Sequence, residues 1–191
     1  MFYYFKTMKR TFIAVEINPG EKLLEALSFL RTSLSREKIK WVSTANMHIT
    51  LAFIGDTPAE TVRSLSRSLS EECSGAGKVT FTLKGTGLFP SLSRPKVIWA
   101  GTEDAGSLIK LNEKVAAIVK SHGIPIEERE FKPHLTLGRI KFIKDNELLA
   151  ELIAEYSQTI FQEAVTDELV YFESLLMPSG PVYKPITRIK L

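Results

Sequence analysis

The stretch Phe131-Lys132-Pro133-His134-Leu135-Thr136-Leu137-Gly138-Arg139 contains the pattern H-L-T-L, and His48-Ile49-Thr50-Leu51 repeats it as H-I-T-L. In a β-strand, alternate side chains point to the same face. Each copy therefore predicts a strand with an imidazole and a hydroxyl on one face and two aliphatic side chains on the other. The aliphatic face belongs in a core, and the polar face belongs at a cleft.

Two such strands lying side by side would bring the imidazoles of His48 and His134 to either side of a small gap. The unperturbed pKa of histidine is about 6.5, so a pair of them can take one proton from an oxygen and give another to an oxygen near neutral pH. The two copies use two of the three histidines in the chain. The alternative is a pair of half-buried structural histidines on sheet edges.

Length and composition indicate one globular unit. The chain has 191 residues, 44% of them hydrophobic and 25% charged, and its net charge of +3 fits an anionic ligand. We expect a single bilobal domain over residues 1–191, with residues 1–8 as a frayed N-terminal extension. No apolar run approaches the ~18–20 residues of a membrane span, so no membrane partner is expected. The single cysteine, Cys73, indicates a reduced thiol in a cytoplasmic protein.

Hydrophobic periodicity predicts alternating helices and strands. Asn18 is expected to cap the first helix, Gly123 to end the third in the left-handed region, and Trp41 and Trp99 to lie in the core. Helices are expected over 19–35, from Thr57-Pro58 onward, and over 105–120 and 146–156. Strands are expected over 11–17, 48–54, 78–88, 96–101, 134–140, within 161–173, and over 183–191.

This order of elements favours an α+β fold. Each motif strand is followed by a helix and further strands, so the chain reads as two similar lobes. Each lobe is expected to hold a mostly antiparallel sheet with flanking helices. The two lobes would be related by pseudo-two-fold symmetry around a central cleft.

The chain resembles the 2H phosphoesterases, and within them the bacterial and archaeal RNA 2′,3′-cyclic phosphodiesterases, also named 2′-5′ RNA ligases. The resemblance implies a LigT-like fold. It also implies an RNA 3′ end with a 2′,3′-cyclic phosphate as substrate, tRNA halves among such ends, opened to a 2′-phosphate without metal or other cofactor. The resemblance also implies a reversible 2′-5′ RNA ligase activity. The matching blocks are Arg10–Val15, Lys40–Val42, Asn46–Gly55, Gly87–Pro90, Val97–Gly101, Phe131–Arg139 and Gly180–Tyr183.

The resemblance also implies roles for the motif residues. His48 is the proton donor and His134 the proton acceptor, although the sequence alone leaves this polarity open. Thr50 and Thr136 would donate hydroxyl hydrogen bonds to the non-bridging phosphate oxygens, where negative charge builds up.

Arg139 matches a family position that holds the phosphate, which suits a guanidinium. Strict alternation puts Arg139, five residues after His134, on the wrong face of the strand. We expect a bulge or a strand end at Gly138 to re-aim it. The equivalent position in the first copy is Phe53, so the two halves of the site cannot be symmetric.

Other side chains are weaker candidates. The aromatic rings that could stack on a base are Phe53, Phe89 and Tyr183, with plain wall or core packing as the alternative. The cations that could guide an RNA backbone are Lys40, Arg94, Lys96, Lys132 and Lys141, with solvated charge as the alternative for each. His122, at a helix end, is expected to be exposed and without a role.

The sequence leaves three other functions open. One is a non-catalytic module that binds RNA ends, and another is a phosphodiesterase acting on small cyclic nucleotides. A metallohydrolase using His48, His134 and a carboxylate ranks last, because the sequence has no H-x-x-x-H pattern or aspartate-rich cluster. We expect no metal site, and we expect a monomer.

Overall fold

The computed structural model describes residues 8–126, 130–178 and 180–191. Met8, which was expected in the N-terminal extension, opens the first strand, and residues 1–7 lie outside the described residues. The elements are β1 (Met8–Glu16), α1 (Glu21–Ser33), β2 (Lys38–Trp41), the 3-10 turn η1 (Thr44–Asn46), β3 (His48–Pro58), α2 (Ala59–Cys73), β4 (Val79–Phe89), β5 (Val97–Glu103), α3 (Gly106–Ser121), β6 (His134–Phe142), α4 (Asn146–Glu155), β7 (Ile160–Thr166), β8 (Glu168–Met177) and β9 (Gly180–Lys190).

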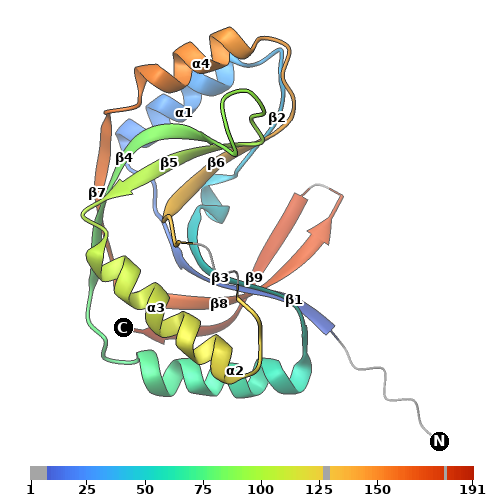
Figure 1. The fold of residues 1–191 in the computed structure, drawn as a ribbon, viewed down its shortest axis with the longest axis vertical. Helices are drawn as coiled ribbons and strands as arrows, with labels where there is room; N and C mark the ends of the chain where they lie inside the picture. The colour runs from blue at the N-terminus through green and yellow to red at the C-terminus, as the bar shows by residue number, and fades with distance from the viewer. Residues whose placement is uncertain (1–7, 127–129, 179) are drawn as a thin grey trace, which may run out of the picture.

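The strands form two antiparallel sheets. Sheet A has the order β3-β1-β8-β9, and sheet B has the order β2-β6-β5-β4-β7. Helices α2 and α3 pack at the sheet A end of the molecule, whereas α1 and α4 lie at the sheet B end (Figure 1). The predicted α+β fold with two lobes is therefore confirmed. Neither lobe is one half of the sequence, because β8 and β9 belong to sheet A whereas β2 and β4 belong to sheet B.

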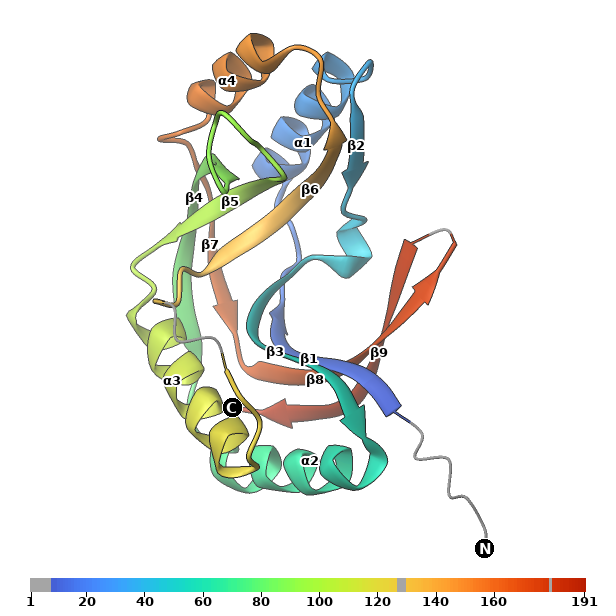
Figure 2. The same cartoon turned by 45° about the vertical axis from the view of Figure 1, so that its right-hand side comes forward.

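The two sheets repeat one spatial arrangement. The order β3-β1-β8-β9 corresponds to β6-β5-β4-β7, so the two motif strands, β3 and β6, take equivalent places (Figure 2). Strand β2 is the exception: it pairs with β6 on the outer side, whereas sheet A, in the part of the chain that the structure describes, ends at β3. The pseudo-two-fold relation thus holds for four strands of each sheet.

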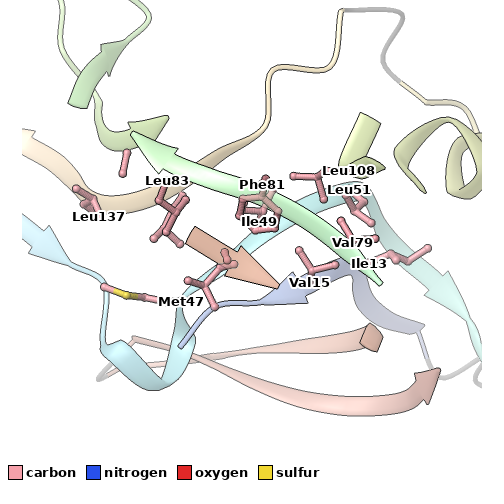
Figure 3. Close-up of a cluster of buried hydrophobic side chains, with 14 of the residues drawn as sticks. Ile13, Val15, Met47, Ile49, Leu51, Val79, Phe81, Leu83, Leu108 and Leu137 are labelled. Carbon is pink, nitrogen blue, oxygen red and sulfur yellow. The ribbon is translucent and has the colours of Figure 1, made fainter. Parts of the chain in front are cut away.

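A single buried cluster connects the lobes. It draws residues from both sheets and from all four helices. Figure 3 shows Val79, Phe81 and Leu83 of β4 beside Ile13 of β1 and Ile49 of β3. Each fully buried aliphatic or aromatic side chain stabilises the fold by about 1.5–3 kcal/mol relative to an exposed one. The two sheets therefore share one core.

Most local predictions are confirmed. The apolar residues at helical spacing are buried in both helices: Val62, Leu65 and Leu69 in α2, and Leu108, Leu111, Val115, Ile118 and Val119 in α3. Gly123 has a φ of 69°, as expected for a helix that ends in the left-handed region. Among the described residues, none of the helices combines the length and the apolar character needed to cross a membrane.

The start of α1 was predicted wrongly. The helix begins at Glu21 after Gly20, and Asn18 does not cap it. The Gly20 amide donates to Oε1 of Gln162 at 2.5 Å, and Nε2 of Gln162 donates to the carbonyl of Asn18 at 3.1 Å. A side chain from β7 therefore accepts the hydrogen bond of a free amide at the helix start. The sequence around residues 18–21 gives no indication of this contact.

Two strand predictions also need correction. Residues 161–173 contain parts of two strands, since β7 pairs in sheet B and β8 pairs in sheet A with only Asp167 between them. The chain changes sheets there without a glycine or proline to mark the turn. Strand β2 was not predicted at all, because four residues are too few to show a period.

Candidate active site

Each motif strand carries a β-bulge at the same position. In the β1–β3 ladder, Thr50 and Ala52 have partners but Leu51 has none, and in the β5–β6 ladder Leu137 is the residue without a partner. A bulge shifts the alternation of side chains by one residue. Residues five positions after each histidine, Phe53 and Arg139, therefore return to the histidine face. The bulge expected at Gly138 lies one residue earlier.

The carbonyl groups of both bulged residues find partners outside their ladders. Nδ2 of Asn112, from α3, donates to the carbonyl of Leu51 at 2.8 Å. The amide of Val42, just beyond β2, donates to the carbonyl of Leu137 at 2.9 Å. A buried carbonyl without a partner is costly, so these contacts stabilise the bulges and keep the strand direction that the site requires. The sequence alone did not indicate either contact.

The two imidazoles are held in the same way. Nδ1 of His48 lies 2.7 Å from the carbonyl oxygen of Asn46, and Nδ1 of His134 lies 2.8 Å from that of Lys132. Because a carbonyl oxygen only accepts, each ring carries its hydrogen on Nδ1 and leaves Nε2 to take up or release a proton. We call the sheet faces that carry His48 and His134 the inner faces of sheets A and B.

The inner faces are close enough to interact electrostatically. Burial lowers the pKa of His48 below its ordinary value of 6.5, and the charges of Arg139 and His134 on sheet B lower it further. The hydrogen bond to Asn46 and the charge of Glu16 raise that pKa. The pKa of His48 is lowered overall, which favours a neutral His48 in the free protein. A phosphate anion placed between the sheets would act in the opposite direction, since a nearby negative charge favours imidazolium.

The inner face of sheet A is lined with aromatic rings. The Phe12 ring centroid lies 5.0 Å from that of His48, 5.0 Å from that of Phe172 and 4.9 Å from that of Tyr183. Tyr183 also meets His48 edge to face at 5.1 Å. Burial raises the pKa of Tyr183, whereas the charge of Arg139 lowers it. Neither Phe12 nor Phe172 was among the predicted site residues.

Sheet B contributes a second aromatic wall. Phe89 packs edge-on against His134, with 4.9 Å between ring centroids, and lies 5.1 Å from Trp99. Trp99 is paired with Thr136, so it lies on the inner face and not in the core as predicted. A Cβ atom at Gly87 would lie 2.1 Å from the Trp99 ring, so a glycine is needed there. The prediction failed because apolar strand residues look alike whichever face they occupy.

The structure brings all seven predicted site residues to the inner faces. Thr50 and Thr136 are half-buried, and in the described ranges neither hydroxyl makes a hydrogen bond with another part of the chain. Phe53 is 55% exposed, and the Arg10 guanidinium lies 4.9 Å from its ring centroid. Exposure and a cation–π contact leave one face of this ring for a ligand. Arg10 was not predicted.

The side chains of the four other basic candidates make contacts away from the aromatic walls. Lys132 forms an exposed ion pair with Glu130 at 3.6 Å. Arg94, Lys96 and Lys141 line a pocket of about 280 Å³ beside the loop between β4 and β5. His122, the residue after α3, is half-buried, and its Nδ1 lies 2.9 Å from the carbonyl oxygen of Ile118, so the prediction of an exposed ring is wrong. Among the described residues, no three His, Cys, Asp or Glu side chains converge as a metal site would require.

Comparison with known proteins gives the family. A family model described as LigT like phosphoesterase matches residues 14–99 and again residues 101–183, and each match contains one H-x-T-x strand. The chain belongs to the LigT-like phosphoesterases. The two matches also agree with the repeated arrangement of strands in sheets A and B.

Individual relatives of this LigT-like phosphoesterase cover nearly its whole length. A Thermotoga maritima protein named RNA 2′,3′-cyclic phosphodiesterase is 34% identical over 177 residues, which is 92% of this chain and 91% of that protein. A protein of the same name from Archaeoglobus fulgidus is 32% identical over 178 residues, 93% of this chain and 97% of the relative. The crystal structure of TT0787 from Thermus thermophilus superimposes with a TM-score of 0.73 at 28% identity, covering 95% of this chain and 97% of that one.

Proposed function

We propose that the protein is an RNA 2′,3′-cyclic phosphodiesterase that opens a terminal 2′,3′-cyclic phosphate to a 2′-phosphate. The observation that carries the proposal is the matched pair of imidazoles, each fixed through Nδ1 and each leaving Nε2 available on an inner face. The names of the relatives from Thermotoga and Archaeoglobus support the same substrate.

The reaction is an in-line displacement at phosphorus. A water oxygen attacks, the bond between phosphorus and the ribose 3′ oxygen breaks, and the phosphate stays on the 2′ oxygen. His134 takes the proton of the attacking water through Nε2, and His48 gives its proton to the departing 3′ oxygen. A ribose 5′ hydroxyl in place of the water would form a 2′-5′ linkage in the same step, with His134 taking the proton of that hydroxyl and His48 giving its proton to the 3′ oxygen.

The proposed donor role of His48 needs a source for its proton. Burial and the charge of Arg139 lower the pKa of His48, so the free protein holds it largely neutral near pH 7. The negative charge of the bound cyclic phosphate raises that pKa again. We infer that substrate and proton bind together, so His48 becomes an acid only when there is a phosphate to act on.

The remaining groups bind the substrate and stabilise the transition state. Thr50 and Thr136 donate hydroxyl hydrogen bonds to the non-bridging oxygens, where charge grows in the transition state. Arg139 supplies a positive charge beside them. Phe53 and Tyr183 offer aromatic faces for the terminal base on sheet A. We assign no metal and no other cofactor to this chemistry, and we infer a monomer acting in the cytoplasm on RNA ends such as those of tRNA halves.

The test is incubation with an oligoribonucleotide that ends in a 2′,3′-cyclic phosphate. We expect a 2′-monophosphate and no 3′-monophosphate, at a rate that EDTA does not change. His48→Ala and His134→Ala should each abolish turnover, whereas His122→Ala, which removes the third histidine, should not. Binding without turnover would instead indicate a module that only holds RNA ends. Turnover of small cyclic nucleotides in preference to the oligonucleotide would indicate the second rival function.

A further inference from the structure

Strand β2, the strand without a counterpart in sheet A, presents two lysines to one side. A Cβ atom at Gly138 would lie 3.0 Å from Cγ2 of Ile39 and 3.0 Å from the ring of Trp41, so these two side chains share the Gly138 face. Alternation sends Lys38 and Lys40 to the opposite face. Both lysines are exposed.

Lys40 lies directly opposite Arg139 in the β2–β6 ladder. Paired residues of neighbouring strands share a face, with their Cβ atoms about 4.5–5.5 Å apart. Besides the effect of burial, the charge of Arg139 acts on the pKa of His48 and on that of Tyr183, both on sheet A. Arg139 therefore faces sheet A, and so does Lys40. Strand β2 thus adds a second cation at the edge of the inner face of sheet B.

Two like charges directly opposite each other weaken a sheet unless something lies between them. Within the described ranges, no carboxylate forms an ion pair with Lys40 or Arg139. The Lys40 side chain also reaches the β8–β9 hairpin: a Cβ atom at Gly180 would lie 3.0 Å from its Nζ and 3.2 Å from its Cε. An anion is the ligand that such a pair of cations accepts.

We propose that Lys40, next to Arg139 on the neighbouring strand, binds the phosphodiester immediately 5′ to the terminal nucleotide, so that an oligoribonucleotide and not a mononucleotide is the preferred substrate. The inference rests on the proposed function. An RNA strand that extends from the histidines toward β2 reaches Arg139 and Lys40 first. It then meets Lys38, which is paired with the 59% exposed Phe142. Sheet A ends at β3 on the equivalent side, so among the described residues it offers no such track.

The test compares two substrates with 2′,3′-cyclic phosphate ends, a mononucleoside and a trinucleotide. Lys40→Met keeps the length of the aliphatic chain and removes the charge. We expect the ratio of kcat/KM for the trinucleotide to that for the mononucleoside to fall about tenfold, the scale of one hydrogen bond to a charged group. Lys40→Arg should restore the ratio, and Lys110→Met, on the exposed surface of α3, should leave it at the wild-type value.

A binding measurement separates this inference from the proposed function. Anisotropy of a labelled RNA trinucleotide ending in a 2′-phosphate is followed over a series of KCl concentrations. Loss of one phosphate contact should reduce the slope of log K against log salt by about 0.7 in Lys40→Met. If the wild-type protein hydrolyses neither substrate, the proposed function fails, and this slope alone decides the role of Lys40.

Three results would count against the inference. An unchanged substrate ratio together with an unchanged salt slope would make Lys40 a solvated surface charge. Equal losses on both substrates would place Lys40 at the cyclic phosphate itself. The thermal midpoint of Lys40→Met should equal or exceed that of the wild type, because the repulsion by Arg139 is removed. A fall in that midpoint would show a structural role and would also count against the proposal.

Discussion

Leu51 and Leu137 are equivalent residues of two matched β-bulges, each three positions after a motif histidine. In each strand the bulge shifts the alternation of side chains by one residue. The residue five positions after the histidine therefore lies on the same face as the histidine. In sheet A that residue is Phe53, and in sheet B it is Arg139. The same backbone device therefore delivers an aromatic ring to one side of the site and a cation to the other.

Thr50→Val and Thr136→Val test the hydroxyl donors. Valine keeps the shape of threonine and removes only the hydroxyl. We expect kcat to fall by roughly 10²–10³ for each variant, the usual effect of losing one donor to a developing oxyanion. Unfolding in urea should be unchanged, because in the described ranges neither hydroxyl bonds to the chain. A valine variant with wild-type kcat would remove that threonine from the mechanism.

Arg139→Gln tests the coupling between the two sheets. Burial is the main cause that lowers the pKa of His48, and the charge of Arg139 lowers it further, so removing that charge should raise the pKa. The change can be followed by NMR titration of the imidazole C–H resonances. Arg94→Gln, on the loop between β4 and β5, is the matched control and should leave the titration unchanged. An identical His48 titration in Arg139→Gln would mean that the guanidinium does not face sheet A.

The lowered pKa of His48 also predicts how stability depends on pH. Unfolding returns this pKa to about 6.5, so the unfolded chain binds more protons as the solution is acidified. The contribution of His48 to stability is therefore complete above pH 6.5 and is lost as the pH falls through the lowered pKa. Urea unfolding of His48→Asn should lack this loss, whereas His122→Asn should retain it. Parallel pH profiles for wild type and His48→Asn would contradict the prediction.

Gly87→Ala tests the packing of the sheet B wall. The new methyl group would lie 2.1 Å from the Trp99 ring, so the ring has to move. We expect a loss of about 1–3 kcal/mol in the free energy of unfolding, the usual effect of overpacking. Gly106→Ala is the control, since a Cβ atom there meets nothing within 4 Å. In a Trp99→Ala background the cost of Gly87→Ala should disappear, and a persistent cost would point to backbone strain.

Asn46→Ala tests a connection between His48 and the β8–β9 hairpin. The Asn46 carbonyl accepts from the His48 ring, while its Nδ2 donates to the carbonyl of Pro181 at 3.2 Å. We expect a loss of about 0.5–1.5 kcal/mol in stability, the value of one hydrogen bond. Amide hydrogen exchange should accelerate at Val182 and Tyr183 but not in α3. Unchanged exchange in the hairpin would mean that the Pro181 contact does not hold it.

The sequence correctly predicted the structural features that depend only on neighbouring residues. The buried stripes of α2 and α3 follow from hydrophobic spacing alone, and the left-handed Gly123 follows from its place at a helix end. The pairing of histidine and threonine on one strand face follows from a period of two. These features need only neighbours within a few residues, so one sequence is enough to read them.

The wrong predictions concern features that depend on residues far apart in the sequence. The start of α1 depends on Gln162, more than a hundred residues away. The change of sheet at Asp167 and the inner position of Trp99 depend on which strand lies alongside, as does the pairing of β2 with β6. Register and strand order are set by long-range contacts, which leave no periodic mark in the segments that make them.

The sequence by itself determined that two histidine–threonine strands would bury aliphatic side chains and expose imidazoles, because alternation is a property of the extended chain. Only the tertiary structure decided that Phe53 and Arg139 join those faces and that Lys40 stands opposite Arg139. Those placements come from bulges and from ladder register. Both arise when strands far apart in the sequence meet and their backbone groups must pair.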